Sequence, residues 1–447
     1  MTGGRVSVQT VVGDEPERAA PDEPRAPTPL RTPAFRRFLL ANLVSATGTA
    51  MAPLALAYAV LGTGGGAGSL GVVLTTTTVP AIVFSLAGGV LADRLPRSRL
   101  LFGGNLLAAG AQAALALLVG LRQAGTFSIA ACGFVSGVAT ALIAPAAQGV
   151  VAQIVAPGHR QQANALVRLP GNGVRVLGPA LGGVLVAAAG PAWALGWDAC
   201  SFLIAAFLLL GLRLNAPAPP PLPPSGPPAS AAANTPATTP LADLRAGWHA
   251  FRSRTWLWTY SVAGTVVVAA WLAGYQLLGP IVAAQRYDGA RAWGLVQGAF
   301  ALGLLAGTVV CLRWRPKRLV AVAVLGSAGL ALPPAAMGLG LPLFWVLLGA
   351  GAGGIGLDIA VVAWTTALQH HVAQGEQGRM SSFTGIGERL AVPFAYLAAA
   401  LAAHTWGNGT VLLVCAAVIA AATVLNLCVR DVHRVDRRTP GGTTGEG

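Results

Sequence analysis

Long runs of apolar residues, separated by short polar or glycine-rich turns, fill the chain from residue 38 to residue 429. A helix needs about 20 apolar residues to cross the hydrocarbon core of a bilayer. Twelve runs meet this requirement, and the shortest turns fall at 190–191 and 338–340. The pattern therefore predicts an all-α integral membrane protein with twelve transmembrane helices. The predicted spans are 38–61, 69–92, 100–120, 127–151, 165–189, 191–212, 256–284, 292–312, 319–338, 341–368, 380–403 and 408–429.

The composition agrees with this pattern. Hydrophobic residues make up 54% of the chain, charged residues only 10%, and the mean hydropathy is +0.65. A soluble domain usually carries about 25% charged residues, so the lipid bilayer is the expected main partner. The net charge of +14 does not indicate nucleic-acid binding, because the basic residues lie between apolar runs and form no folded basic patch.

The distribution of basic residues predicts an orientation. Cytoplasmic loops of membrane proteins carry an excess of Lys and Arg. If the N-terminus lies inside, twenty-three of the 29 Lys and Arg residues are cytoplasmic, three are external and three fall within spans. We therefore expect both termini in the cytoplasm. The abundance of Ala, Gly and Arg is typical of a GC-rich bacterial gene, so the expected location is the bacterial plasma (inner) membrane.

A stretch rich in Pro, Ala and Ser divides the chain into two halves. This stretch covers 216–241 and is expected to be a flexible linker. Residues 242–254, which follow it, could form an amphipathic helix on the inner membrane surface, with Trp248 and Phe251 on its apolar side. It could equally be a positively charged anchor. The predicted organisation is a disordered cytoplasmic tail at 1–34, a six-helix half at 35–214, a cytoplasmic linker at 215–255, a second six-helix half at 256–430 and a cytoplasmic tail at 431–447.

The two halves share a local pattern. Residues 171–179 read GNGVRVLGP and residues 385–393 read GIGERLAVP. Four residues coincide at an offset of 214: Gly171 with Gly385, Gly173 with Gly387, Arg175 with Arg389 and Pro179 with Pro393. Two six-helix pseudo-repeat halves with matching positions place a substrate site between the halves, near the middle of the membrane.

The sharpest local motif is GGVLADRLPRSRLL at 88–101, between spans two and three. It resembles the loop 2–3 signature of the major facilitator superfamily, Gly-x-Leu-Ala-Asp-Arg-x-Gly-Arg. Pro96 stands where the family usually has Gly, and Ser98 where it often has a basic residue. The residues that match in order are Gly89, Leu91, Ala92, Asp93, Arg94 and Arg97.

The resemblance implies that this loop is a conformational latch between the halves. Asp93 would face the start of span eleven near Ser381 and Ser382, where a carboxylate meets the positive helix end. Arg94 and Arg97 would form ion pairs or bind lipid phosphates. The alternative is a positively charged loop that only sets the topology.

A second motif lies in span five. Gly178, Pro179, Gly182 and Gly183 resemble the GPxxGG motif of the superfamily's drug:proton antiporters. Generic packing of small residues is the alternative. The stretches FRRFLLAN and WDACSFL look closest to a branch of macrolide-efflux-like and enterobactin-exporter-like permeases.

Charged residues within spans are costly in lipid and are candidates for function. A proton-coupled carrier needs a carboxylate that changes protonation, and Asp358 is the first candidate, with Glu388 second. Glu388 could instead form a structural pair with a nearby Arg. Asp198 is expected to cap a helix or hydrogen-bond near the outer surface. Arg175 and Arg389 are expected to share a structural role, with substrate binding as the alternative.

Several other patterns carry no catalytic chemistry. The GxGxxG match at 349–354 lies within an apolar span rather than after a strand. The five cysteines fall in or beside apolar runs without CxxC spacing, so we interpret them as packing residues. No metal-ligand or nucleophilic set is spaced for catalysis. We therefore expect no enzyme activity, no cofactor and no metal, and we expect a monomer.

These patterns together predict a secondary active transporter that exports a small apolar or amphiphilic compound, such as a drug, antibiotic or secondary metabolite. Proton antiport and alternating access are implied by the resemblance. The alternatives are a proton-coupled symporter that takes up a metabolite, and a membrane sensor or scaffold that transports nothing. Aromatic residues at Tyr58, Trp271, Tyr275, Trp364 and Tyr396 could line a substrate cavity.

Overall fold

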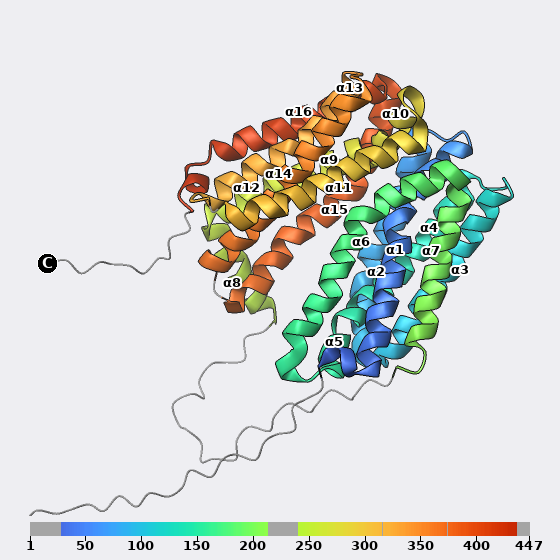
Figure 1. Ribbon diagram of the computed structural model, residues 1–447. Helices are drawn as coiled ribbons and strands as arrows, with labels where there is room; N and C mark the ends of the chain where they lie inside the picture. The colour runs from blue at the N-terminus through green and yellow to red at the C-terminus, as the bar shows by residue number, and fades with distance from the viewer. Residues whose placement is uncertain (1–27, 213–239, 315, 373, 436–447) are drawn as a thin grey trace, which may run out of the picture.

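The computed structural model describes residues 28–212, 240–314, 316–372 and 374–435 (Figure 1). In this part of the chain, twelve helical segments are long and apolar enough to cross a membrane. The predicted number of spans is therefore confirmed. Helices are the expected solution in lipid, because every backbone N–H and C=O group must find its partner within the segment.

The first group of helices comes from the N-terminal half. It comprises α1 (Pro33–Gly62), α2 (Ala67–Arg94), α3 (Arg97–Gly120), α4 (Thr126–Gln148), α5 (Val150–Ile154), α6 (Arg160–Ala189) and α7 (Pro191–Leu209). The second group comprises α8 (Pro240–Ser253), α9 (Thr255–Trp271), α10 (Gly279–Arg286), α11 (Gly289–Arg313), α12 (Leu319–Ala328), α13 (Leu332–Gly338), α14 (Leu343–His371), α15 (Gln374–Trp406) and α16 (Asn408–Leu427).

The predicted seventh span is interrupted. Between α9 and α10, residues Leu272–Leu278 form a π-helical segment. Pro280 follows closely and has no amide N–H to donate to the preceding turn. Single π-helical turns inside α-helices often mark functional sites. The apolar pattern alone runs unbroken through this point, so hydropathy did not predict the change in helix type.

Helix α8 occupies the place of the proposed amphipathic segment. Phe251 is buried, and its ring lies 5.7 Å from that of Trp248 and 5.7 Å from that of Phe383 on α15. Arg254, just after α8, donates a hydrogen bond of 3.1 Å to Glu376 on α15. This helix therefore packs on the start of α15. Its contact with a membrane surface stays a prediction, as do the tails and linker at 1–27, 213–239 and 436–447, which lie outside the described residues.

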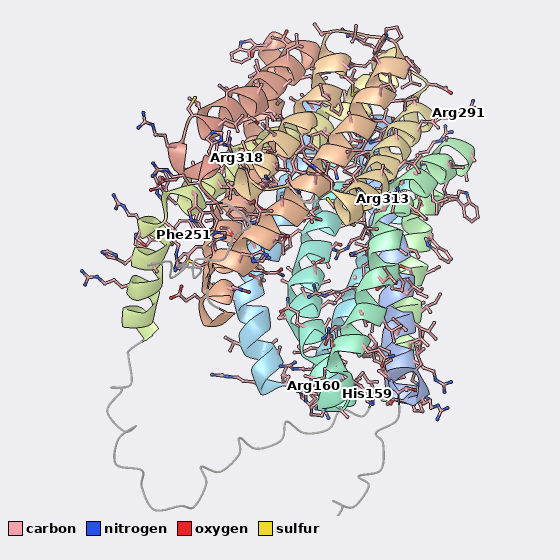
Figure 2. All side chains as sticks on the ribbon, turned by 60° about the vertical axis from the view of Figure 1, so that its left-hand side comes forward. His159, Arg160, Phe251, Arg291, Arg313 and Arg318 are labelled. Carbon is pink, nitrogen blue, oxygen red and sulfur yellow. The ribbon has the colours of Figure 1, made fainter. Side chains whose placement is uncertain are left out.

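The two ends of the molecule differ in how the halves pack. We call the end where α1 begins and α16 finishes the terminal end, and the other end the distal end. Figure 1 shows two groups of helices, blue to green and yellow to red. Figure 2 shows His159 and Arg160 at the terminal end of the first group, and Arg291 at the distal end.

Buried apolar clusters follow the same division. One cluster near the terminal end, around Phe35 and Leu101, contains residues of the first half only. A second, around Leu257 and Leu319, contains residues of the second half only. The largest cluster joins both halves and includes Leu70, α10 and distal residues of α11. The halves thus share a core at the distal end and have separate cores at the terminal end.

Small residues make the distal contact between the halves. A Cβ atom at Gly71 of α2 would lie 2.8 Å from the Cβ atom of Ala400 on α15. A Cβ atom at Gly294 of α11 would lie 2.8 Å from the Cα atom of Gly183 on α6. Glycine lets helix backbones approach closely. In lipid there is no hydrophobic driving force between helices, so such close packing favours their association.

This contact gives a test of how tightly the halves are packed. Gly183→Ala should destabilise the protein by about 1–3 kcal/mol, because the added methyl group would overlap Gly294 and force the helices apart. The measurement is the thermal unfolding midpoint of the purified protein in detergent.

The matched control lies on the same helix. A Cβ atom at Gly173 would meet nothing within 4 Å. Gly173→Ala should therefore keep or raise the midpoint, since alanine favours a helix by roughly 0.5–1 kcal/mol over glycine. Equal midpoints for the two variants would contradict the close packing at Gly183.

Candidate functional site

The GPxxGG-like motif of α6 is a packing surface for two helices. Gly178 faces Ala50 on α1, and a Cβ atom at Gly182 would lie 3.0 Å from the Cβ atom of Met51 on the same helix. Gly183 faces the other half, as described above. The motif thus holds α6 against its own half and against the second half at once.

Pro179 of this motif lines a small cavity between the halves. Its volume is about 40 Å³, and its walls come from α1, α2 and α6 on one side and from Gln276, Pro280 and α11 on the other. Ligand sites for drug-sized molecules usually measure about 300–1,000 Å³. In this conformation the cavity is too small for such a compound.

A larger cavity lies inside the second half. It has a volume of about 320 Å³ and is lined by α9, α12, α14, α15 and α16, with Leu330 between α12 and α13. Among the described residues that line it, Glu388 is the one with a charge. The ring centroids of Tyr260 and Trp364 lie 3.9 Å apart in a stacked arrangement on its wall. We call this the C-half cavity.

Glu388, the second coupling candidate, therefore lies on a cavity wall. Among the described side chains it forms no ion pair, while the positive charge of Arg389 acts on its carboxylate from a greater distance. The alternative of a structural pair with an arginine stays a prediction. Its sequence neighbour Arg389 is exposed. Arg175, the repeat-related residue on α6, is exposed as well. Neither arginine is paired with a carboxylate in the described part of the chain.

Asp358, the first coupling candidate, joins two neighbouring helices. The hydroxyl of Thr308 on α11 donates a hydrogen bond of 3.0 Å to its carboxylate on α14. A Cβ atom at Gly307 would lie 2.8 Å from the Cβ atom of Asp358, so glycine lets the helices meet there. The carboxylate is half-buried and close to the C-half cavity in sequence, since Leu357 and Val361 line that cavity.

Asp198 lies in the interior of the first half. It is only 1% exposed, and Gln112 on α3 donates a hydrogen bond of 2.7 Å to its Oδ2 atom. Its Oδ1 atom has no hydrogen-bond partner among the described residues. Gly48 on α1 leaves room for this group, because a Cβ atom there would crowd Ser201 and Asp198. The hydrogen bond joins two neighbouring helices rather than capping one.

The proposed latch loop is described in part. The side chains of Asp93, Ser381 and Ser382 lie outside the described residues, so their contact stays a prediction. Arg94 is exposed. The guanidinium of Arg97 occupies the space where a side chain at Gly149 would stand, so it packs against the chain between α4 and α5.

The two glycines of the latch motif differ in their surroundings. A Cβ atom at Gly89 would meet nothing within 4 Å. A Cβ atom at Gly88 would collide with the carbonyl of Ala141 on α4. The close approach of α2 and α4 therefore depends on Gly88, the residue before the motif's glycine. The helix contact thus depends on the glycine just before the motif, and the predicted latch role of Gly89 stays a prediction.

Several residues of the C-half cavity were not predicted. Tyr260, Ser261 and Thr423 lie on its wall, and so does Asn426. Asn426 is 4% exposed, and its Oδ1 atom has no hydrogen-bond partner in the described residues. A polar amide within the apolar span 408–429 was the available signal. Of the aromatic candidates, Trp364 lines this cavity, whereas Trp271, Tyr275 and Tyr396 lie in the distal core.

These features define a multi-pass membrane protein, with two helical halves and polar groups inside the helix bundles. The chain belongs to the Major Facilitator Superfamily, a family of transporters, whose sequence profile matches residues 38–391. In this family a small molecule is the expected partner. Among the described residues, no group of three or more His, Cys, Asp and Glu side chains is placed to hold a metal ion.

Curated relatives include enterobactin exporters. The chain is 29% identical over 191 residues to the exporter EntS of Citrobacter koseri, which covers 42% of this chain and 45% of that protein. It is 29% identical over 192 residues to EntS of Shigella flexneri, and this match covers 42% of this chain and 46% of that protein. The chain thus spans less than half the length of the curated relatives it matches.

Solved structures match over nearly the whole chain. A bacterial homologue of the iron transporter ferroportin, in an inward-facing state, gives a TM-score of 0.66 at 18% identity, covering 90% of this chain and 99% of that one. The peptide transporter POT in complex with sulfate gives a TM-score of 0.65 at 16% identity, covering 91% and 96%. At these identities the likeness shows the shared fold.

The Asp198–Gln112 contact gives a prediction about stability. Gln112→Leu should lower the unfolding free energy by about 1–3 kcal/mol, because the buried carboxylate would lose the side-chain donor that the described residues provide for it. The thermal midpoint in detergent measures this. Gln162→Leu, at an exposed position of α6, should shift the midpoint by much less. A Gln112→Leu variant as stable as the Gln162→Leu variant would contradict the structural role of the contact.

Proposed function

We propose that this protein exports a small apolar or amphiphilic compound across the inner membrane by proton antiport, with both termini in the cytoplasm. The observation that carries the proposal is the hydrogen bond from Thr308 to Asp358 between α11 and α14. A carboxylate, which is able to accept a proton, lies at the junction of two membrane-spanning helices. Membrane-embedded carboxylates are costly and usually mark proton or substrate pathways.

The position of this contact suits a coupling of protonation to the movement of the halves. Thr308 lies fourteen residues after Gly294 on α11, about 21 Å further along the helix. Gly294 is where α11 touches α6 of the other half. Protonation of Asp358 would remove the charge that Thr308 stabilises and so loosen α11 from α14. A shift of α11 would then be felt at the contact between the halves.

The separate cores at the terminal end support alternating access. Among the described residues, the buried apolar cluster that joins the halves lies at the distal end, and the clusters at the terminal end each belong to one half. With the termini in the cytoplasm, this arrangement corresponds to a state closed to the outside. Rocking of the halves about the small distal contacts would close the terminal end and open the distal end. The latch formed by Asp93, Arg94 and Arg97 would stabilise the state closed to the cytoplasm.

Two observations favour export over uptake. The GPxxGG-like residues of α6 pack as a unit between α1 and α11, and this motif resembles that of drug:proton antiporters. The curated relatives are named as enterobactin exporters. The substrate class stays broad, because the aromatic and apolar residues of the cavity walls select for shape and polarity rather than for one compound.

The coupling hypothesis predicts the behaviour of one substitution. Asp358→Asn should abolish substrate-driven proton flux in proteoliposomes, because an amide cannot bind and release the proton. Substrate counterflow without a gradient should persist. Asp288→Asn, at an exposed position between α10 and α11, is the matched control and should retain coupled flux.

Retention of coupled efflux in both Asp358→Asn and Glu388→Gln would overturn the assignment of the coupling residues. A complete absence of substrate-dependent proton flux in the unmodified protein, tested with a panel of toxic compounds, would favour a membrane sensor instead.

The direction of transport can be tested in vesicles of defined orientation. An exporter driven by protons should accumulate its substrate in inverted vesicles when the interior is made acidic, because protons then leave as substrate enters. Right-side-out vesicles should extrude preloaded substrate when the exterior is acidic. Accumulation driven by an inward proton gradient only in right-side-out vesicles would show uptake and contradict the proposal.

A further inference from the structure

The C-half cavity is separate from the contact between the halves. All its lining residues come from the second half. Its volume of about 320 Å³ falls at the lower end of the range for small-molecule sites. It is therefore large enough for a compact polar group or a short part of a longer molecule. The small cavity at Pro179, between the halves, is eight times smaller.

The chemistry of the C-half cavity suits a cation. Glu388 is its one charged lining residue and has no ion-pair partner in the described part of the chain. The stacked rings of Tyr260 and Trp364 form an aromatic wall, and Trp256 lies edge-on to Trp364 at 5.7 Å. Aromatic faces attract ammonium groups, and more strongly where water is excluded.

Asn426 adds a free hydrogen-bond acceptor. Its Nδ2 atom donates to the carbonyl of Thr259 at 3.3 Å, which orients the amide. Its Oδ1 atom is buried and has no partner among the described residues. A buried acceptor without a partner costs free energy, and a ligand N–H group would satisfy it. A protonated amine supplies both the positive charge for Glu388 and N–H donors for Asn426.

A groove on the outside of the helix bundle reaches the same residues. It runs between α9 and α16, has a volume of about 430 Å³, and is lined mainly by apolar side chains such as Trp258, Val262 and Leu425. We call it the α9–α16 groove. Trp258 and Leu425 are exposed on the surface, and both lie towards the terminal end of their helices.

The groove and the cavity share three lining residues, Ala263, Ala422 and Asn426. At these positions a single residue separates the cavity from the groove. Two of the three shared residues are alanines. Small side chains leave little to move aside when a ligand passes. The apolar groove fits a hydrocarbon chain, and the acidic cavity behind it fits a charged head group.

We propose that the C-half cavity binds the protonated amine of an amphiphile whose hydrocarbon chain lies in the α9–α16 groove, and that the amphiphile reaches the cavity laterally from the bilayer. With the termini in the cytoplasm, the groove faces the inner leaflet. This inference rests on the proposed function in one respect: the site would load the exported compound. The binding step itself needs no proton gradient.

The test uses photoreactive probes on the full-length protein in lipid nanodiscs. The probes are dodecylamine, dodecanol and dodecanoic acid, each with a diazirine in the chain, and labelled peptides are identified by mass spectrometry. Dodecylamine should label residues 256–268 and 418–429. Its labelling should exceed that of dodecanol by about tenfold, as expected for a charge-assisted contact in a partly dry site. Dodecanoic acid should label least.

Substitutions separate the two parts of the site. Glu388→Gln should reduce the amine-to-alcohol ratio to about one, whereas Glu388→Asp, which keeps the charge, should retain a ratio above that of Glu388→Gln. Ala422→Phe should block passage through the wall, so dodecylamine would label the groove but no longer protect Glu388 from a carboxyl-reactive carbodiimide. Ala417→Phe, at an exposed position of α16 that lines neither space, should behave as the unmodified protein.

The outcomes distinguish this site from the proposed function. Equal labelling by amine and alcohol in the unmodified protein would overturn the cation site, even if coupled export is observed. Protection of Glu388 in Ala422→Phe equal to that in Ala417→Phe would overturn the lateral route. Amine-selective labelling that depends on Glu388, in a protein without proton-coupled flux, would uphold the site and refute the antiport proposal.

Discussion

Close contact between helix backbones is the constraint on which the arrangement of the two halves depends. In lipid, apolar side chains gain little by leaving their solvent, so helices associate where their surfaces fit closely. Gly183 of α6 meets Gly294 of α11, and Gly71 of α2 meets Ala400 of α15. Both contacts lie at the distal end. The shared distal core, the separate terminal cores and the direction in which the halves can part all follow from this placement.

Two carboxylates inside the bundles follow a second pattern, because each accepts a hydrogen bond from a neighbouring helix. Gln112 on α3 donates a hydrogen bond to Asp198 on α7, and Thr308 on α11 donates one to Asp358 on α14. Glu388 is the exception, since no such partner is provided for it among the described residues. A carboxylate without an ion-pair partner on a cavity wall is suited to reversible binding of a proton or of a cationic ligand.

The spans could be predicted from the sequence because length and hydrophobicity are local properties. The prediction of 319–338 agrees with the structure at both ends, Leu319 and Gly338.

The site could be predicted only in part. Asp358 and Glu388 stood out because a charge in an apolar run is visible in one dimension. Asn426 and Tyr260 could not be predicted in this way. Their place on the cavity wall depends on how α9 and α16 are rotated towards α15, and the sequence of one span does not contain this information. The importance of Gly88 over Gly89 likewise depends on which face of α2 meets α4.

The π-helical segment Leu272–Leu278 has a further consequence. A π-helical turn holds one more residue than an α-helical turn of the same kind. The seventh span therefore contains one residue more than an uninterrupted α-helix with the same number of turns would contain. Converting the turn to α-helix, or passing it along by one position, would rotate the side chains on one side of it relative to the other. Trp271 and Tyr275, whose rings are stacked at 4.0 Å within this stretch, would then change their position relative to each other.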